Sequence, residues 1–219
     1  MEQFIEKKGL TSFQLKWIAI ISMFADHVGA LLCSREMWLR YVGRLAFPIF
    51  CFLLVEGFFH THDIRRYMIR LGTFAILSEI PFDIAFAGRV MEIRMQNVFF
   101  TLFLGVVMIY FLEKSKGYLE KSMIVFFIMW LASFLHTDYG MRGILLVLIF
   151  YVFRHYNVLK LTAGICWNFI WGTKIQVFGG FSVIPIALYN GKEGRKMKFF
   201  FYMFYPIHLL VLTIIARSI

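Results

Sequence analysis

Residues 41–59 read YVGRLAFPIFCFLLVEGFF, nineteen consecutive positions of which only Arg44 and Glu56 carry a charge. Wound as an α-helix with a rise of about 1.5 Å per residue, about 20 apolar residues cross a hydrocarbon layer of about 30 Å. Runs of similar length and character occupy residues 13–33, 67–87 and 197–216. The stretch therefore predicts a membrane-spanning helix, one of several in the chain.

The whole chain shares this apolar character. Of its 219 residues, 60% are hydrophobic and 16% are charged, and its mean hydropathy is +0.73. Ordinary globular chains are about half apolar and about a quarter charged, so this composition excludes a protein built around one water-soluble core. Because only short connections separate the apolar segments, we expect an all-α, polytopic transmembrane helical bundle of about nine (eight to ten) helices. It forms a single domain, residues 1–219.

Nine apolar segments make up this prediction. The sixth to eighth are roughly 14 or 15 residues long, below the usual spanning length, so a re-entrant segment or a locally thin bilayer is the alternative there. The nine segments are 13–33, 41–59, 67–87, 96–113, 119–136, 140–154, 158–171, 176–189 and 198–216.

Lysine and arginine fall unevenly on the two sides of such a bundle. If the segments alternate, 15 of the 23 basic residues lie on the side of the N-terminus, and ten of the eleven lysines are among them, including Lys7 and Lys8. Cytoplasmic loops are enriched in both residue types. We therefore expect a multi-pass protein of the bacterial cytoplasmic (inner) membrane with a cytoplasmic N-terminus. The net charge of +10 then reflects the basic residues on the expected cytoplasmic side of the membrane. No soluble segment is long enough to bind nucleic acid.

Several ionisable residues interrupt the apolar segments. A charged group at the centre of a bilayer costs about 2.5–3.5 kcal/mol on insertion scales, so these groups must face one another or a watery cavity. For three groups a purely structural role stays open: Arg40 and Arg44 as interfacial anchors, Glu56 with His60 as a structural pair, and Asp138 with Arg142 as a salt bridge at a helix end. The ionisable residues that lie within the apolar segments are Lys16, Asp26, His27, Arg44, Glu56, Glu79, Asp83 and His208. The three cysteines lack metal-ligand spacing, so no metal site is expected.

Six polar-bearing stretches together resemble the TraX family in order and spacing. They are FADHVGA (24–30), LRYVGRLAFPIFCFLLVEGFFHT (39–61), RLGTFAILSEIPFDIAF (70–86), QNVFFTLFLG (96–105), HTDYGMRGILL (136–146) and FYMFYPIHLLVL (201–212). The resemblance implies a membrane enzyme similar to the F-pilin acetylase, which acetylates the N-terminal amine of pilin. The implied enzyme is more distantly similar to integral-membrane acyltransferases that use acyl-CoA.

This resemblance implies an acetyl-CoA-dependent N-acetyltransferase whose acceptor is a peptide, such as a pilin-like N-terminus, or a small-molecule amine. Its expected partners are membrane lipid and that acceptor, with no nucleic acid. A proton-coupled transporter of a small solute is the alternative, because intramembrane Asp, Glu and His also form proton relays. The expected site residues are, for catalysis, His27, Asp26, Glu79, Asp83 and His208; for acetyl-CoA, Arg44, Glu56, His60, Arg65 and Arg66; and for the acceptor, Gln96, Asn97, Asp138 and Arg142. Of these, His60, Arg65 and Arg66 do not come from the resemblance: His60 shares a helical face with Glu56, and the two arginines are expected phosphate contacts on the cytoplasmic side.

Within this set, His27 is the expected general base, since histidine titrates near neutrality. Neighbouring residues on a helix point about 100° apart, so Asp26 is expected to pair with an arginine such as Arg44. The group that orients His27 should then come from another helix, with Glu79 or Asp83 as candidates. His208 is an alternative acid, base or acetyl carrier, and Gln96 and Asn97 are the expected oxyanion donors.

Overall fold

The structure is a computed structural model that describes residues 9–171 and 173–218. Over these residues it contains ten α-helices and one 3-10 helix, and its β pairing is limited to two isolated bridges. Lys7 and Lys8 lie outside the described residues. The helices are α1 (Ser12–Leu31), α2 (Met37–Gly43), α3 (Ala46–His60), α4 (Ile64–Phe86), α5 (Val98–Lys114), α6 (Tyr118–Phe134), α7 (Gly140–Val152), α8 (Asn157–Ile170), η1 (Gln176–Ser182), α9 (Val183–Ala187) and α10 (Lys198–Ser218).

The apolar segments of the sequence correspond to these helices, with two differences. The segment 41–59 is divided where α2 ends at Gly43 and α3 begins at Ala46, so Arg44 stands at a junction between two helices. The short segment 176–189 is a 3-10 turn followed by a five-residue helix, and not one continuous helix. The all-helical prediction is therefore confirmed.

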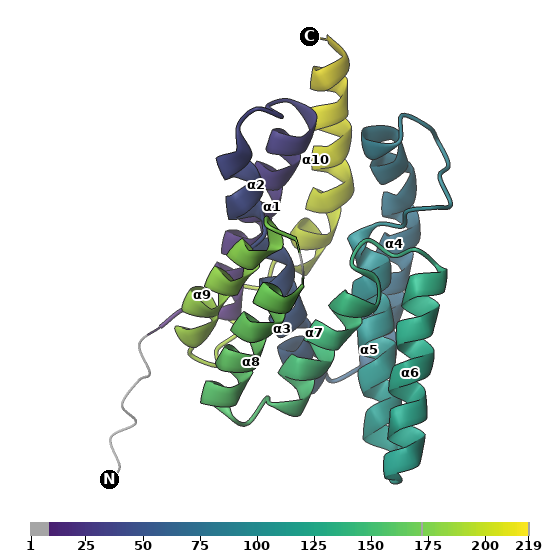
Figure 1. The fold of residues 1–219 in the computed structure, drawn as a ribbon, viewed down its shortest axis with the longest axis vertical. Coiled ribbons are helices and arrows are strands. Elements are labelled where there is room, and N and C mark those ends of the chain that lie inside the picture. The colour runs from purple at the N-terminus through teal and green to yellow at the C-terminus, as the bar shows by residue number, and fades with distance from the viewer. Residues whose placement is uncertain (1–8, 172, 219) are drawn as a thin grey trace.

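Helix α3 lies in the interior of the bundle. Its residues from Ala46 to Val55 are buried except Phe50, which is partly buried. It packs against α1, α5 and α7, while α10 packs against α1 and α4. Figure 1 shows α4, α5 and α6 side by side, and it shows α1, α2 and the C-terminal half of α10 gathered at one end of the molecule. This arrangement brings residues from the start and the end of the chain together.

The outer faces of the bundle remain apolar. Ile76 of α4 keeps 69% of its surface exposed, Phe126 of α6 keeps 70% and Ile214 of α10 keeps 66%. Among the described residues, two helical runs are long and apolar enough to cross a membrane, Met37–His60 and Lys198–Ser218. The number of crossing helices expected from the sequence, about nine, remains a prediction.

Candidate active site

A cavity of about 210 Å³ lies among α1, α2, α3, α4, α5, α10 and the loop that joins α6 to α7. Phe47, Phe50, Phe82 and Phe86 form much of its apolar wall. The polar side chains that line it are Asp26, His27, Arg40, Arg44, Asp138 and Tyr139. The structure therefore brings together ionisable residues that are more than a hundred positions apart in the sequence.

Asp26 is the centre of a buried charge cluster. The Nη1 atom of Arg40 donates to the Asp26 carboxylate at 3.2 Å and to the Asp26 carbonyl at 3.1 Å, and Arg44 donates to the same carboxylate oxygen, Oδ2. The two arginine side chains are 27% and 16% exposed, so they are held inside the protein and are not interfacial anchors. The expected pairing of Asp26 with Arg44 is confirmed, and Arg40 joins it.

Two further features mark this cluster. The second carboxylate oxygen of Asp26, Oδ1, is buried without a hydrogen-bond partner. Gly43 lies so close to Asp26 that any β-carbon at position 43 would collide with the Asp26 side chain. The glycine of the Val-Gly-Arg sequence is therefore required for helix α2 to approach α1, because no larger residue fits against the carboxylate.

His27 forms a hydrogen bond with a second histidine. Its Nδ1 atom lies 2.6 Å from Nε2 of His208 on α10, and the two rings are nearly parallel, with 8° between their planes. His208 is buried, and its own Nδ1 lies 2.7 Å from the carbonyl oxygen of Phe204. The partner that orients His27 does come from another helix, but it is His208. The expectation of Glu79 or Asp83 in that role is wrong.

The hydrogen bonds assign the ring protons. A carbonyl oxygen accepts hydrogen bonds and cannot donate, so Nδ1 of His208 carries a proton and donates to Phe204. In the neutral ring, Nε2 of His208 is then a lone-pair acceptor, which requires Nδ1–H of His27 to donate to it. Consequently Nε2 of neutral His27 holds a lone pair. His27 lines the cavity, so this nitrogen is the basic atom of the site.

The loop between α6 and α7 closes another side of the cavity. Its backbone is fixed by Gln96: the Gln96 N–H donates to the carbonyl of His136 at 2.9 Å, and the Asp138 N–H donates to the carbonyl of Gln96 at 2.8 Å. Tyr139 stacks on Phe47 of α3, with ring centroids 3.5 Å apart. The loop is thus held against both α3 and the start of α5.

Asp138 is the carboxylate of this loop that faces the cavity. Its side chain lies at the exposed edge of the cavity. Partial loss of water around the carboxyl raises the pKa of Asp138 from 3.8 to about 6, and the positive charge of Arg44 opposes the increase. Asp138 therefore holds its proton more tightly than an ordinary aspartate does.

Glu79, Asp83, Gln96 and Asn97 have structural partners. The Asn97 side chain caps α5 by accepting from the Phe99 N–H at 3.0 Å, and its amide donates to the Ala75 carbonyl at 2.8 Å and to Glu79. Asp83 accepts from the Glu92 N–H at 2.8 Å. Because the Asn97 amide is already used in this way, the expectation that Gln96 and Asn97 supply oxyanion donors is wrong for Asn97. Gln96 acts through its backbone.

The residues expected to bind acetyl-CoA do not lie together. Arg44 lines the cavity, whereas Glu56 and His60 lie about 18 and 24 Å away along α3 at 1.5 Å per residue. Arg65 and Arg66 are exposed at the start of α4, and Arg66 pairs with Asp63 at 3.0 Å. The five residues therefore do not form one local cluster, and their part in acetyl-CoA binding stays a prediction.

Arg142 also lies away from the polar cluster. Its side chain is exposed at the start of α7, and its carbonyl accepts a hydrogen bond from the Trp167 indole at 3.1 Å. Asp138 instead faces the charge of Arg44, so the expected pairing of Asp138 with Arg142 is wrong.

Three polar residues of the cavity were not singled out for the site from the sequence: Arg40, Tyr139 and Tyr205. Arg40 lies four residues before Arg44, on the same helical face, and that spacing is a usable signal. For the two tyrosines the sequence offers no such signal, because aromatic residues are abundant throughout this chain. Their role appears only when the helices are packed.

Comparisons with known proteins identify the family of the chain. Residues 12–216 match the family described as TraX protein. The probable fimbrial assembly protein FimC, serogroup H1, of Dichelobacter nodosus is 30% identical over 92% of this chain and 94% of its own length. Protein TraX of Escherichia coli is 24% identical over 63% of this chain and 54% of its own length.

An uncharacterized protein of Rickettsia prowazekii (strain Madrid E) is 26% identical over 66% of this chain and 57% of its own length. The chain therefore spans little more than half of that protein and of the E. coli TraX protein. No solved structure matches it. The family match covers all but the first 11 and the last three residues, and every stretch that builds the cavity lies within it, so the chain belongs to the TraX family.

Proposed function

We propose that the protein is a membrane-embedded acetyltransferase that transfers an acetyl group from acetyl-CoA to an amine, with a pilus or fimbrial subunit as the acceptor. Membership of the TraX family supports a function related to pilins, as does the similarity to a probable fimbrial assembly protein. The observation that carries the proposal is the lone pair on Nε2 of His27 in a cavity that also contains two arginines.

Acetyl-CoA, when bound, supplies a thioester whose acetyl group forms an amide bond with the amine while the C–S bond breaks. In this scheme Nε2 of His27 takes the proton that the attacking amine loses. The positive charge that then develops on His27 is shared through Nδ1–H with His208, whose ring is held by the Phe204 carbonyl. The proton on His27 is subsequently available to the departing sulfur, so the base returns to its starting form.

Arg40 and Arg44 supply positive charge opposite this base. Asp26 engages one nitrogen of each guanidinium group through the same carboxylate oxygen, which leaves other N–H groups of the two arginines available near the cavity. Preorganised donors of this kind stabilise a carbonyl oxygen as it gains negative charge. Asp26 thus acts as a positioning residue, and the arginines take the role first expected of Gln96 and Asn97.

The size of the cavity limits what it can hold. Pockets for whole drug-sized ligands measure about 300–1,000 Å³, whereas this cavity measures about 210 Å³. The cavity therefore suits an acetyl group and the chain adjoining it, and the nucleotide would lie outside. Asp138 at the cavity edge provides a carboxylate that favours a positively charged amine near neutral pH.

A direct transfer assay tests the proposal. The full-length protein, reconstituted in lipid vesicles, is incubated with isotopically labelled acetyl-CoA and a peptide whose only amine is its N-terminus. The mass of the peptide is then measured by mass spectrometry. We expect the peptide to gain one labelled acetyl group. If amines of peptides and of small molecules all stay unmodified under conditions in which the protein remains folded, the acetyltransferase proposal fails.

The proposed location is the bacterial inner membrane, crossed several times with a cytoplasmic N-terminus. Exposed apolar side chains on α4, α6 and α10 support a lipid environment, because such surfaces in water would drive aggregation. A reporter active only outside the cytoplasm should be active when fused after Ile219 and silent when inserted between Lys114 and Lys121. The opposite pattern would reverse the proposed orientation.

A further inference from the structure

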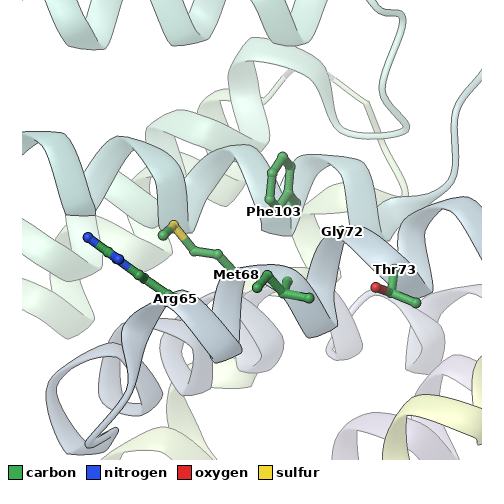
Figure 2. Close-up of a pocket in the computed structure, with 6 residues that line it drawn as sticks. Arg65, Met68, Gly72, Thr73 and Phe103 are labelled. Carbon is green, nitrogen blue, oxygen red and sulfur yellow. The ribbon is translucent and has the colours of Figure 1, made fainter.

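A second hollow, of about 460 Å³, lies on the outer surface of α4 and α5 and shares none of its lining residues with the cavity. Figure 2 shows Arg65 at one end of a row along α4 and Thr73 at the other, with Met68 between them and Phe103 of α5 facing the row. Ile69 and Gly72 complete the lining. Apart from Arg65 and Thr73, these residues present only apolar atoms.

The hollow follows from the spacing of residues on α4. Arg65, Ile69, Gly72 and Thr73 lie on one face, since residues three, four and seven apart share a face of an α-helix. Gly72 has no side chain, and a β-carbon there would lie 3.4 Å from the Phe103 ring, in ordinary contact. The missing side chain at position 72 therefore contributes to the hollow, and a larger residue there would fill part of it.

Positive charge gathers at one end of this hollow. Lys114, the last residue of α5, donates from Nζ to the hydroxyl of Tyr110 at 2.5 Å and lies 4.2 Å from the centre of the Tyr110 ring. Arg65 interacts with the same hydroxyl. Within the described part of the chain, neither Arg65 nor Lys114 forms an ion pair with a carboxylate. Two cations and a phenol thus lie together, and the nearest carboxylates in the sequence, Asp63 and Glu113, pair with other arginines.

We propose that this hollow, with Arg65, Lys114 and Tyr110, is a binding site for one anionic phospholipid of the cytoplasmic leaflet. The phosphate lies against the two cations and accepts from the tyrosine hydroxyl, and an acyl chain follows Met68, Gly72 and Phe103 toward Thr73. Charge complementarity favours this occupant, because basic pockets on the cytoplasmic side of membrane helices bind anionic headgroups. The inference rests on the proposed location in the membrane and does not depend on acetyl transfer.

Native mass spectrometry of the detergent-purified full-length protein tests this site by titration with phosphatidylglycerol or phosphatidylcholine of matched acyl chains. We expect one phosphatidylglycerol to bind at least about fivefold more tightly than phosphatidylcholine. Arg65→Gln should remove that preference, because it removes a phosphate contact. Gly72→Leu should weaken the binding of both lipids, because it fills the space for the acyl chain.

Arg66→Gln is the matched control. It changes the charge by the same amount at the adjacent position, but Arg66 pairs with Asp63 and does not line the hollow. Unchanged lipid preference in Arg66→Gln, together with its loss in Arg65→Gln, supports the site. Equal binding of the two lipids by the wild type, or an equal effect of the two arginine substitutions, overturns it. Because lipid binding is measured without acetyl-CoA, either result leaves the acetyltransferase proposal to its own test.

Discussion

The two ends of helix α3 contain similar residue types but use them differently. At the Arg44 end, Asp26, His27, Arg40 and His208 meet partners 14 to 181 positions away in the sequence, inside a cavity. At the His60 end, the ion pairs are local: His60 approaches Glu56 at 4.0 Å, and Arg66 pairs with Asp63 three residues away. Two longer-range contacts also reach this end, since Glu56 interacts with Tyr189 and Arg154 lies 3.9 Å from the centre of the Phe59 ring. The side chains of His60 and Arg66 are 65% and 80% exposed.

This difference separates a site from a charged surface. Local pairs on an exposed helix end contribute little to stability and leave their groups in water. Groups that converge from several helices lose water, interact more strongly, and stay fixed relative to one another. Convergence with desolvation, and not the density of ionisable residues in the sequence, is what marks the Arg44 end as the candidate active site.

The largest effect is expected from Asp26→Asn. This substitution leaves Arg40 and Arg44 facing a neutral amide in a buried position, which should lower the free energy of unfolding by about 3–5 kcal/mol. The matched change at the other end, Asp63→Asn, keeps a helix cap and breaks only an exposed ion pair, so it should cost at most about 1 kcal/mol. Thermal unfolding in mild detergent compares the two. Equal losses would remove the distinction between the two ends.

His27→Ala should reduce acetyl transfer by at least about 10²-fold, because it removes the proposed general base. His62→Ala, which truncates an exposed histidine of the turn after α3, should leave the rate within about twofold of wild type. Rates are measured in the peptide transfer assay, with the unfolding temperature of each variant as a check on folding. Full activity in His27→Ala would require the base to be another residue.

Gly43→Ala should destabilise the protein by about 1–3 kcal/mol, since its β-carbon would collide with Asp26 and force α1 and α2 apart. The control lies at the other end of α3, where a β-carbon at Gly57 would meet only the end of the Tyr67 side chain at 3.2 Å. Gly57→Ala should therefore cost less. A larger loss for Gly57→Ala would contradict the close approach described for Asp26.

The last prediction concerns pH and Asp138, whose exposed side chain weakens the effect through solvent screening. Its pKa is raised on folding from 3.8 to about 6, so the folded state holds this proton more tightly. The associated stability is fully present below about pH 4 and is lost as the pH rises through about 6. Asp138→Asn keeps the uncharged form at every pH. The unfolding temperature of this variant, relative to that of wild type, should therefore increase between pH 4 and 6 and stay constant above pH 6. A constant difference across this range would contradict the raised pKa.

Much of the fold is predictable from the sequence because apolar runs directly reflect helices. The bounds of the expected segments agree with α1 and α4 to α8 within a few residues at most ends. The division between α2 and α3 was not expected, because the residues on both sides of Arg44 are apolar. Pro48 is a local signal for it, since proline has no N–H to donate to the carbonyl four residues earlier, that of Arg44. The close approach of Gly43 to Asp26, by contrast, depends on helix packing.

The candidate site is predictable only in part. Asp26 is buried and pairs with Arg44 as the direction of neighbouring helical side chains suggested, because that argument needs only helix geometry. The partner of His27 depends on which helix lies beside α1, and that helix, α10, is separated from it by most of the chain. Glu79 and Asp83 were both candidates for that partner, and only the packing directs them to Asn97 and Glu92.

Affinity labelling tests most directly whether the Arg44 end is the active site. Coenzyme A carrying a bromoacetyl group alkylates a nearby nucleophile, because a histidine nitrogen displaces bromide from the CH2–Br carbon. The exposed cysteines Cys33 and Cys166 are first replaced by serine. Our account predicts an adduct on the peptide that contains His27, prevented by excess acetyl-CoA and absent in His27→Ala. A protected adduct on the peptide that contains His60 and His62 would contradict it and place the acetyl group at the other end of α3.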